Sequence, residues 1–598
     1  MIRSRSARFG ALLLAFASSA FLAASAPQDG GVVEASAKRG PKVLDPAACG
    51  IGERVSRLPW RDLLGRPGRL GEVGARKGQV VALTDTTCPL AQKLAPSLAR
   101  LQARCRDEGL ELVLLNTSEE EERADALRWV EQHGIEVPYV LDPTGELARA
   151  LDARTTTDVF LLDAEGRRVY RGAIDDRIGI GYTREVAREE YLEAAIDALL
   201  EGGAAPVPAT WAPGCVLDLE EPEGASELTW HGRVSRIVER RCGSCHVEGG
   251  VAPFALSARA DVKRRKGMVR FVLEERLMPP WGAEPGSGPW RNDHSLPEPE
   301  RADLLAWLEA GLPEGDPSSA APARAAVDST EWLIGTPDLI VEIPREQSIP
   351  AEGYLDYIEF VVPLGLTEDR WVTAVEIQPT APQVVHHVVV HVLTEGGLRE
   401  SRSTLPGFMA GYVPGNRSNV LPPGFARKLP AGSRLFFQLH YTPNGTPAVD
   451  RTRLALVFQD QAPEHEVKSI GIANKRFEIP PGESHVAVEA GLKLPKAIGV
   501  LSLMPHMHLR GEAFRITADP PKRAPLTLLD VQRYDFNWQF AYRFEDPVIL
   551  PKGTRLGVTG WFDNSDANPA NPNPSKTVRW GDQTYEEMMI GYVEYYVL

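Results

Sequence analysis

Between residues 71 and 215, short apolar runs alternate with longer stretches in which apolar residues recur at helical spacing. The apolar runs, which we expect to form strands, are VVALT (80–84), LELVLL (110–115), PYVLD (138–142), DVFLLD (158–163) and VYRGAID (169–175). The helical spacing covers residues 88–105, 118–133 and 187–201. Strands that alternate with helices predict an α/β layer fold.

Two further patterns follow along the chain. A Pro/Ala-rich break at 202–214 precedes a short helical region at 228–315, which ends in the helix ERADLLAWLEAG (300–311) with Gly311 as its C-cap. After a linker at 316–331, helical periodicity vanishes, and short apolar runs are separated by Pro and Gly up to residue 598. This pattern is typical of antiparallel β-sandwiches. We expect one sandwich at 332–472 and another at 473–598.

The N-terminal residues have the pattern of a secretory signal peptide. Three arginines (Arg3, Arg5, Arg8) precede an apolar stretch from Ala11 to Ala24, and small residues follow. We therefore expect a signal peptide at 1–26 and an irregular lead-in at 27–70, the alternative being a short membrane anchor. No later stretch reaches about 18 uninterrupted apolar residues, so we expect no transmembrane segment in the mature chain, which would be periplasmic or extracellular.

Length and charge narrow the class of protein. The chain has 598 residues, too many for one hydrophobic core. Its formal net charge is −15 and no long basic run occurs, which argues against nucleic acid as a partner.

Residues 242–246 read Cys-Gly-Ser-Cys-His. Two thiols at this spacing, Cys242 and Cys245, can add to the vinyl groups of haem, and His246 is then placed to ligate the iron. The alternatives are a disulfide or a thioredoxin-type redox pair. The region 228–315 resembles a small all-α cytochrome c domain, which implies one covalently bound haem c. For the sixth iron ligand we favour Met278, in Leu-Met-Pro-Pro-Trp, over Met268.

Half of the twelve histidines lie in three short motifs of the β region. His506 and His508 are two residues apart, so their imidazoles leave the same face of a strand. With Met588 they offer two nitrogens and a thioether, a ligand set soft enough for Cu(I). His386 and His387 are adjacent, so they bind one metal, with His440 as third ligand, only if the strand bends or ends there.

The motifs HHVVVH, QLHY, HMH and EEM resemble those of the type II copper, ascorbate-dependent monooxygenases, which include the peptidylglycine and dopamine hydroxylases. The resemblance covers residues 332–598 and implies two jelly-roll-like sandwiches with one copper each. The copper held by His386, His387 and His440 would relay electrons. The copper held by His506, His508 and Met588 would bind O₂ and abstract hydrogen from a C–H bond.

The resemblance is incomplete around the substrate. The peptide-amidating relatives hold a carboxylate with an arginine where this chain has Met504, and with an asparagine where it has Ile590; Tyr592 alone matches. A buried carboxylate needs a charged or hydrogen-bonding partner. We therefore expect no peptide amidation. His391 is outside the family pattern, and we interpret it as a group behind the ligands or on the surface, rather than as a spare ligand.

Residues 71–215 resemble a thioredoxin or redoxin fold. Cys88 follows a strand and begins a helix, a position that lowers a thiol pKa. The motif reads Cys-Pro-Leu-Ala, so the second cysteine of a CxxC pair is missing. Thr157 stands where the relatives have a cis-proline, and Asp85 where peroxidase relatives have a threonine. A structural role and thiol chemistry stay equally open. Cys88 could pair with Cys49, Cys105 or Cys215, although Cys105 is too far along the same helix.

Three functions remain from these residues. The leading hypothesis is a copper-dependent monooxygenase that acts on a small-molecule or peptide substrate with O₂, and receives electrons from ascorbate, a redox protein or its own tethered haem. The second is a non-enzymatic electron-transfer or copper-binding protein. The third is a thiol–disulfide oxidoreductase, against which the missing second cysteine argues.

Overall fold

A computed structural model describes residues 38–72, 74, 76–118, 121–217, 219, 228–320, 331–394 and 407–598, which fall in one compact unit. The expected signal peptide and the first part of the lead-in lie outside these residues. Within the described ranges, no helix is both long and apolar enough to cross a membrane.

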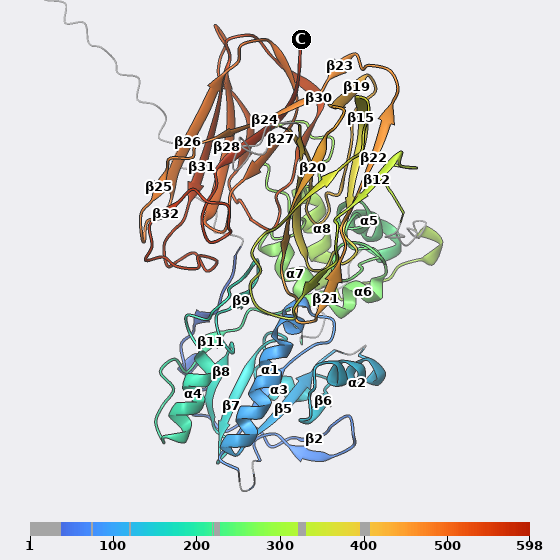
Figure 1. The fold of residues 1–598 in the computed structure, drawn as a ribbon. Coiled ribbons are helices and arrows are strands. Elements are labelled where there is room, and N and C mark those ends of the chain that lie inside the picture. Colours follow the sequence, from blue (N-terminus) through green and yellow to red (C-terminus); the bar gives the residue numbers. More distant parts are fainter. Residues whose placement is uncertain are drawn as a thin grey trace, which may run out of the picture. The chain divides into compact units, whose positions relative to one another are not determined.

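The first domain is built on a five-stranded mixed sheet in the order β6-β5-β4-β7-β8 (Figure 1). Its strands are β4 (Gly78–Leu83), β5 (Leu110–Asn116), β6 (Tyr139–Leu141), β7 (Val159–Asp163) and β8 (Arg168–Gly172). The central strand β4 runs parallel to β5 and antiparallel to β7. Each expected apolar run is a strand here, and the predicted α/β class is confirmed.

Helices cover both faces of this sheet because its strands are apolar on both sides. They are α1 (Pro89–Glu108), α2 (Arg123–Gln132), α3 (Glu146–Ala150) and α4 (Tyr191–Leu200). Apolar side chains of α1, α2 and α4 share one core with one face of the sheet. Those of α3 share a second core with the other face. The second helix begins five residues later than the expected Ser118, at Arg123.

The segment expected to be an irregular lead-in takes part in this domain from residue 38 onward. Strand β1 (Lys42–Val43) pairs with β11 (Thr210–Trp211), and β2 (Pro59–Arg61) pairs with β3 (Pro67–Arg69). Val55, Trp60 and Leu70 are buried in the second core. The short elements rely on this tertiary packing, which local composition did not reveal.

The region 228–315 is helical and has a core of its own, formed by apolar residues from all of its helices. Its elements are a π-helical turn η2 (Trp230–Val234), α5 (Ser235–Arg241), α6 (Arg259–Arg264), α7 (Lys266–Glu274) and α8 (Glu298–Glu309). The centre is Trp307, which is fully buried and lies 5.7 Å from the ring of Trp230.

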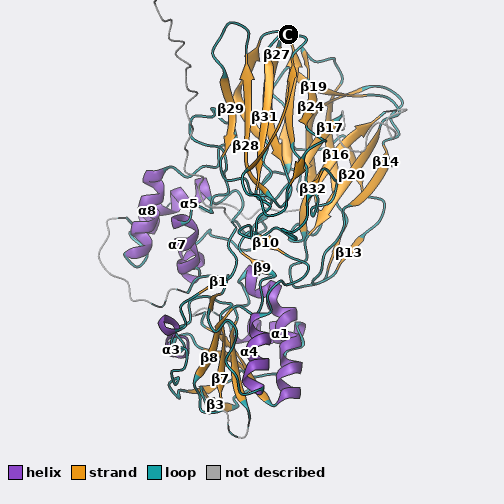
Figure 2. Cartoon of the chain, turned by 90° about the vertical axis from the view of Figure 1, so that its left-hand side faces the viewer, coloured by secondary structure: helices purple, strands orange, loops and turns teal. Residues whose placement is uncertain are grey.

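Strands dominate the chain after residue 332 (Figure 2), as the sequence predicts. In the first sandwich one sheet has the order β12-β22-β15-β19-β23, and the other has the order β14-β20-β16-β17. The strands of the second sheet, which carry the histidines, are β14 (Ile358–Pro363), β16 (Val385–Leu393), β17 (Phe408–Tyr412) and β20 (Arg434–Tyr441). The strands of the first sheet are β12 (Leu339–Glu342), β15 (Arg370–Gln378), β19 (Phe425–Leu429), β22 (Arg453–Gln459) and β23 (His465–Glu466), and β18 (Ser418–Val420) also pairs with β15. One apolar core joins the two sheets.

The second sandwich pairs two four-stranded antiparallel sheets, β24-β33-β27-β30 and β26-β31-β28-β29. The first consists of β24 (Lys468–Ala473), β27 (Ile498–His506), β30 (Tyr542–Leu550) and β33 (Ile590–Val597). The second consists of β26 (Val486–Lys493), β28 (Gly511–Asp519), β29 (Leu526–Val531) and β31 (Arg555–Phe562). Because β24 pairs with β33, this sandwich begins at Lys468 rather than at the expected residue 473.

Phe514 on β28 is fully buried in the core of the second sandwich. We expect Phe514→Ala to lower the free energy of unfolding of this sandwich by about 3–5 kcal/mol, because the cavity adds to the lost transfer free energy. Leu526→Ala, at a largely exposed position of the neighbouring strand β29, should change it by less than about 0.5 kcal/mol. Urea unfolding followed by tryptophan fluorescence measures both, and equal effects would contradict this packing.

Candidate functional sites

Three imidazoles converge at the end of the neighbouring strands β16 and β20. His387 on β16 lies opposite His440 on β20, and His386 precedes His387. One ring nitrogen from each of these residues lies within 4.8 Å of the others. The three side chains expected to share one metal are therefore together.

A β-bulge allows two adjacent histidines to reach the same place. The pairing of β16 with β20 shifts register between Val385 and His387, so His386 has no residue opposite it. An extra residue of this kind bends the strand and redirects its side chain. The sequence-based condition, that the strand must bend at His386, is met.

The electrostatics of this cluster suit a metal. Burial lowers the pKa of His386 to about 4, and burial together with the neighbouring imidazoles lowers the pKa values of His387 and His440 well below their usual value. The rings are therefore neutral and can offer lone pairs. His387 Nε2 and His440 Nδ1 are buried without a hydrogen-bond partner among the described residues. Such orphaned nitrogens are costly unless a ligand occupies them.

The second predicted set lies at the end of β27. This strand ends at His506, so His508 lies just beyond it and not on a regular strand, but their ring centroids are still 5.3 Å apart. His506 Nδ1 is 2.6 Å from Gln539 Oε1, and His508 Nδ1 is 3.3 Å from the Glu586 carbonyl oxygen. His508 Nε2 has no partner within the described part of the chain. Second-layer contacts of this kind orient a metal-binding imidazole.

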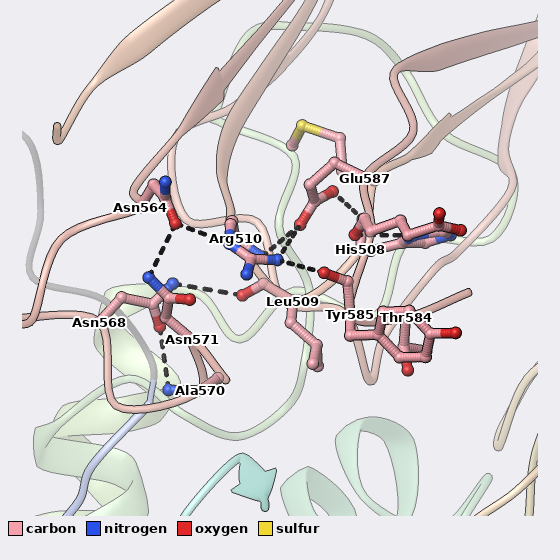
Figure 3. A network of polar contacts seen from close by, with 12 residues as sticks. His508, Leu509, Arg510, Asn564, Asn568, Ala570, Asn571, Thr584, Tyr585 and Glu587 are labelled. Carbon is pink, nitrogen blue, oxygen red and sulfur yellow. Dashed lines mark hydrogen bonds and ion pairs between the residues drawn. The ribbon is translucent and has the colours of Figure 1, made fainter. Parts of the chain in front are cut away.

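Met588 is buried and lines the same cavity as His506. Directly before it, the buried Glu587 carboxylate accepts hydrogen bonds from the backbone N–H groups of His508 and Arg510, at 2.8 and 2.7 Å (Figure 3). Glu587 therefore ties the Met588 segment to the segment that carries both histidines. Sequence reasoning missed this residue because its partners lie far away in the chain.

A wider network supports Arg510. Its Nε donates to Asn564 Oδ1 at 2.8 Å, and Asn571 donates to the same oxygen at 3.0 Å (Figure 3). Its Nη1 donates to the Tyr585 carbonyl oxygen at 3.0 Å. Arg510, Asn564 and Asn571 are all fully buried. A satisfied buried network holds one geometry, which benefits a metal site.

Two aromatic residues contact both histidine sets. The Tyr357 ring lies 4.9 Å from that of His440 and 6.4 Å from that of His508. The Phe536 ring lies 4.6 Å from that of His386 and 6.0 Å from that of His508. Neither aromatic residue belongs to a motif, so no sequence pattern predicts their role.

A cavity of about 520 Å³ joins the two sets and is lined by residues that include His387, His506 and Met588. Tyr592 lines it too, with its ring 6.5 Å from His506, and burial raises its pKa so that the phenol keeps its proton. Met504 and Ile590 also lie in the wall. Among the described residues of this wall there is no Lys or Arg to bind a carboxylate.

His391 is not a surface residue, and that part of the interpretation was wrong. Its side chain is 3 % exposed and lines the same cavity, and burial lowers its pKa to about 3. The strand alternation that places it on the His387 face also directs it inward.

The Cys242–His246 motif forms one helical turn after α5, with the His246 N–H donating to the Cys242 carbonyl at 2.9 Å. His246 Nδ1 lies 2.9 Å from the Phe254 carbonyl oxygen, which leaves Nε2 for a ligand. Both thiols are free and half-buried, and burial raises their pKa values. Met278 lies four residues after α7 and is half-buried. These residues fit a covalently attached haem, with the sixth ligand still a prediction.

Cys88 is the N-cap of α1, and its thiol is 2 % exposed. Burial alone would raise the pKa of Cys88, but hydrogen bonds from the Cys215 thiol, the Thr156 hydroxyl and the Ala91 N–H lower it below its usual value. Cys105 lies near the other end of α1, and burial raises its pKa to about 12. The expectation that Cys88 and Cys105 are too far apart agrees with these positions.

Comparisons with known proteins match this first domain. Residues 51–170 match the AhpC/TSA family. The chain is also 24% identical over 149 residues to the thiol-disulfide oxidoreductase ResA of Halalkalibacterium halodurans, which covers 25% of this chain and 79% of that protein. The chain contains a redoxin domain. The thioredoxin-like fold that the sequence predicts for it is thus confirmed, and the matched range begins within the expected lead-in.

Solved structures similar to the chain are small by comparison. The protein SMc02350 of Sinorhizobium meliloti 1021 is 26% identical with a TM-score of 0.27, covering 31% of this chain and 99% of its own. A secreted disulfide oxidoreductase of Mycobacterium tuberculosis is 17% identical with a TM-score of 0.17, covering 19% and 80%. These values describe likeness over a part of the chain only. The redoxin domain is thiol-disulfide oxidoreductase-like.

We expect Glu587→Gln to weaken copper binding at the His506, His508 and Met588 set by about 10–100-fold, because the amide loses an acceptor for one of the two N–H groups. Competition with a chromophoric Cu(I) chelator measures the affinity. Glu586→Gln is the matched control, since its half-buried side chain leaves the Glu586 carbonyl contact to His508 in place. Equal affinities of the two variants would contradict a positioning role for Glu587.

Proposed function

We propose that this chain is an exported, copper-dependent monooxygenase with a fused c-type haem and a redoxin domain. The observation that carries the proposal is the convergence of His386, His387 and His440, whose nitrogens lie within 4.8 Å of one another. His387 and His440 are buried and neutral and each has one unpartnered ring nitrogen among the described residues, which suits a metal. The comparisons support oxidoreductase chemistry only for the redoxin domain. The copper hypothesis therefore rests on this geometry and on the motifs.

Each copper would have its own ligands: His386, His387 and His440 for one, and His506, His508 and Met588 for the other. Bound copper would supply one-electron redox chemistry toward O₂ and a C–H bond. The chain itself orients His506 through Gln539, and it ties the Met588 segment to His508 through Glu587. Burial of both sets keeps water away from the reacting centre.

The cavity indicates the class of substrate. Its wall combines apolar residues such as Met504 and Ile590 with polar ones such as Tyr592 and Gln438. Because the described wall offers no cationic side chain, a neutral organic substrate fits better than a peptide carboxylate. A protonated Tyr592 phenol can donate a hydrogen bond to such a substrate.

The haem would be held by Cys242 and Cys245 through thioethers, with His246 and Met278 as iron ligands. It would supply single electrons. Its attachment to the same chain raises its effective concentration at the copper domain. Ascorbate or a redox protein would then need only to reduce the haem.

Metal analysis tests the proposal directly. We expect about two copper and about one iron per full-length chain. His440→Ala should lose one copper and the reductant-dependent uptake of O₂. His465→Ala should lose neither, because the half-exposed His465 ring lies against Phe425 and Tyr596 and not in the His386–His440 cluster. Protein that binds zinc but no copper, or that binds copper without O₂ uptake, would contradict the proposal.

Thiol–disulfide exchange by the redoxin domain is the second candidate function. The observation that favours it is Cys88 at the start of α1 with a lowered pKa, in a domain that is similar to a thiol-disulfide oxidoreductase. A thiolate stabilised at a helix N-terminus is a good leaving group and a good nucleophile. This activity can coexist with copper chemistry in one chain.

Exchange between glutathione disulfide and a dithiol substrate, followed in the full-length protein, tests this candidate. We expect Cys88→Ser to lower the rate at least about tenfold, because the stabilised thiolate is lost. Cys105→Ser, on the same helix, should leave the rate unchanged because its raised pKa keeps that thiol inert. An unchanged rate in Cys88→Ser would remove the candidate.

A further inference from the structure

The redoxin domain lacks the second cysteine of a CxxC motif, yet Cys88 faces another thiol. The thiols of Cys88 and Cys215 are hydrogen-bond partners. Cys215 belongs to the Pro-rich break far downstream and lies outside the residues that match the redoxin family. The local motif therefore gives no sign of this pair.

Backbone pairing fixes Cys215 in place. Its carbonyl accepts from the Thr156 N–H at 2.9 Å, and its own N–H donates to Thr156 Oγ1 at 3.1 Å. A β-bridge joins Thr155 to Val216, the next residue. On the other side, Thr157 Oγ1 donates to the Pro213 carbonyl at 3.0 Å. The segment 213–216 is thus held along the loop 155–157.

The segment 213–216 also lies very close to the loop 155–157. A Cβ at Gly214 would lie 2.4 Å from Thr157 Oγ1, so a side chain there would push the segment off the loop. The same loop reaches Cys88, because Thr156 Oγ1 donates to Cys88 Sγ at 3.1 Å. One hydroxyl therefore contacts the sulfur of Cys88 and the backbone N–H of Cys215, which holds the two residues close together.

The surroundings make the two sulfurs unequal. The Cys88 thiol is 2 % exposed, whereas Cys215 is half-buried. Hydrogen bonds lower the pKa of Cys88, whereas the Cys88 sulfur and burial raise the pKa of Cys215 well above its usual value. Cys88 is the stable thiolate, and Cys215 is the more exposed residue of the two, with a thiol that keeps its proton.

We propose that Cys88 and Cys215 form a reversible disulfide that oxidises dithiols, with Cys215 as the sulfur that the dithiol attacks. This inference rests on the second candidate function, thiol–disulfide exchange, and names its missing cysteine. Neither Cys49 nor Cys105 fits the role of partner to Cys88. The Cys49 carbonyl accepts a hydrogen bond from Arg168, and the Cys105 thiol lies beside Arg104 and Glu193.

The chemistry balances with a protein or small-molecule dithiol as the reductant. One thiolate of the dithiol attacks Cys215 Sγ; the Cys88–Cys215 bond breaks, and Cys88 leaves as a thiolate held by Thr156 and the start of α1. The second thiolate of the dithiol attacks its own sulfur in the mixed disulfide, and Cys215 leaves and takes up a proton. Two electrons pass from the dithiol to the pair. A leaving thiol of low pKa accelerates the first step and favours the reduced protein, as in strongly oxidising pairs.

Peptide mapping of the full-length protein after equilibration in glutathione buffers, with acid quenching and alkylation, tests the pair. In oxidising buffer we expect a Cys88–Cys215 cross-link that dithiothreitol reduces in the folded protein. Cys88→Ser should collect glutathione at Cys215. When glutathione opens the cross-link in the folded unmodified chain, the mixed disulfide should form at Cys215, because Cys88 is the better leaving thiolate. Cys105→Ser should behave as the unmodified chain.

The outcomes separate the two claims. A link from Cys88 to Cys49 or Cys105, a mixed disulfide at Cys88 rather than at Cys215 when glutathione opens the cross-link, or a cross-link that dithiothreitol cannot reduce without unfolding would overturn the inference. If Cys88 is required for exchange but Cys215→Ser and Cys215→Ala both exchange at the original rate, the pairing fails and the second candidate function stands. Matching thermal unfolding of the two Cys215 variants and the unmodified chain shows that the fold is intact.

Discussion

The irregular pairing of β16 with β20 is the constraint on which the first histidine cluster depends. A regular strand would send His386 and His387 to opposite faces, one into the sandwich core and one away from it. The register shift after Val385 removes that alternation for one residue, while His387 keeps its place opposite His440. The hydrogen-bond ladder between β16 and β20 is therefore irregular at one residue. This irregularity brings together three imidazoles that two regular strands would keep apart.

Burial then decides what these imidazoles do. A neutral ring nitrogen in an apolar setting costs free energy until it finds a donor or a metal, and His387, His440 and His508 each have one such nitrogen. Other buried polar groups nearby are hydrogen-bonded, as the contacts of Glu587, Arg510 and Asn564 show. Orphaned nitrogens inside a well-satisfied surrounding are better explained by function than by poor packing.

Sequence reasoning succeeded where the pattern is local. The alternation of apolar runs is enough for the five strands of the redoxin domain, whereas a haem at Cys242, Cys245 and His246 stays a prediction. It identified the histidines of both sets, but not the bulge that gathers them, since strand register depends on a partner strand. His391 was misread because strand alternation alone does not say which face is buried. Glu587 and Tyr357 could not be found, because each matters only through residues distant in sequence. For the same reason the sequence left Cys215 as one of three possible partners of Cys88.

Arg265 lies near both the Cys88–Cys215 pair and the Cys242–His246 motif. Arg265, between α6 and α7, lies within electrostatic range of Asp85 and Cys215. Its guanidinium also lies 4.3 Å above the Phe254 ring, and the Phe254 carbonyl is the partner of His246 Nδ1. Cys215 itself is on the segment that leads from the redoxin domain to the helical region. Formation of the proposed Cys88–Cys215 bond would convert a hydrogen-bonded contact of that segment into a covalent one. The oxidation state of the pair would therefore affect the segment that leads to the domain with the Cys242–His246 motif.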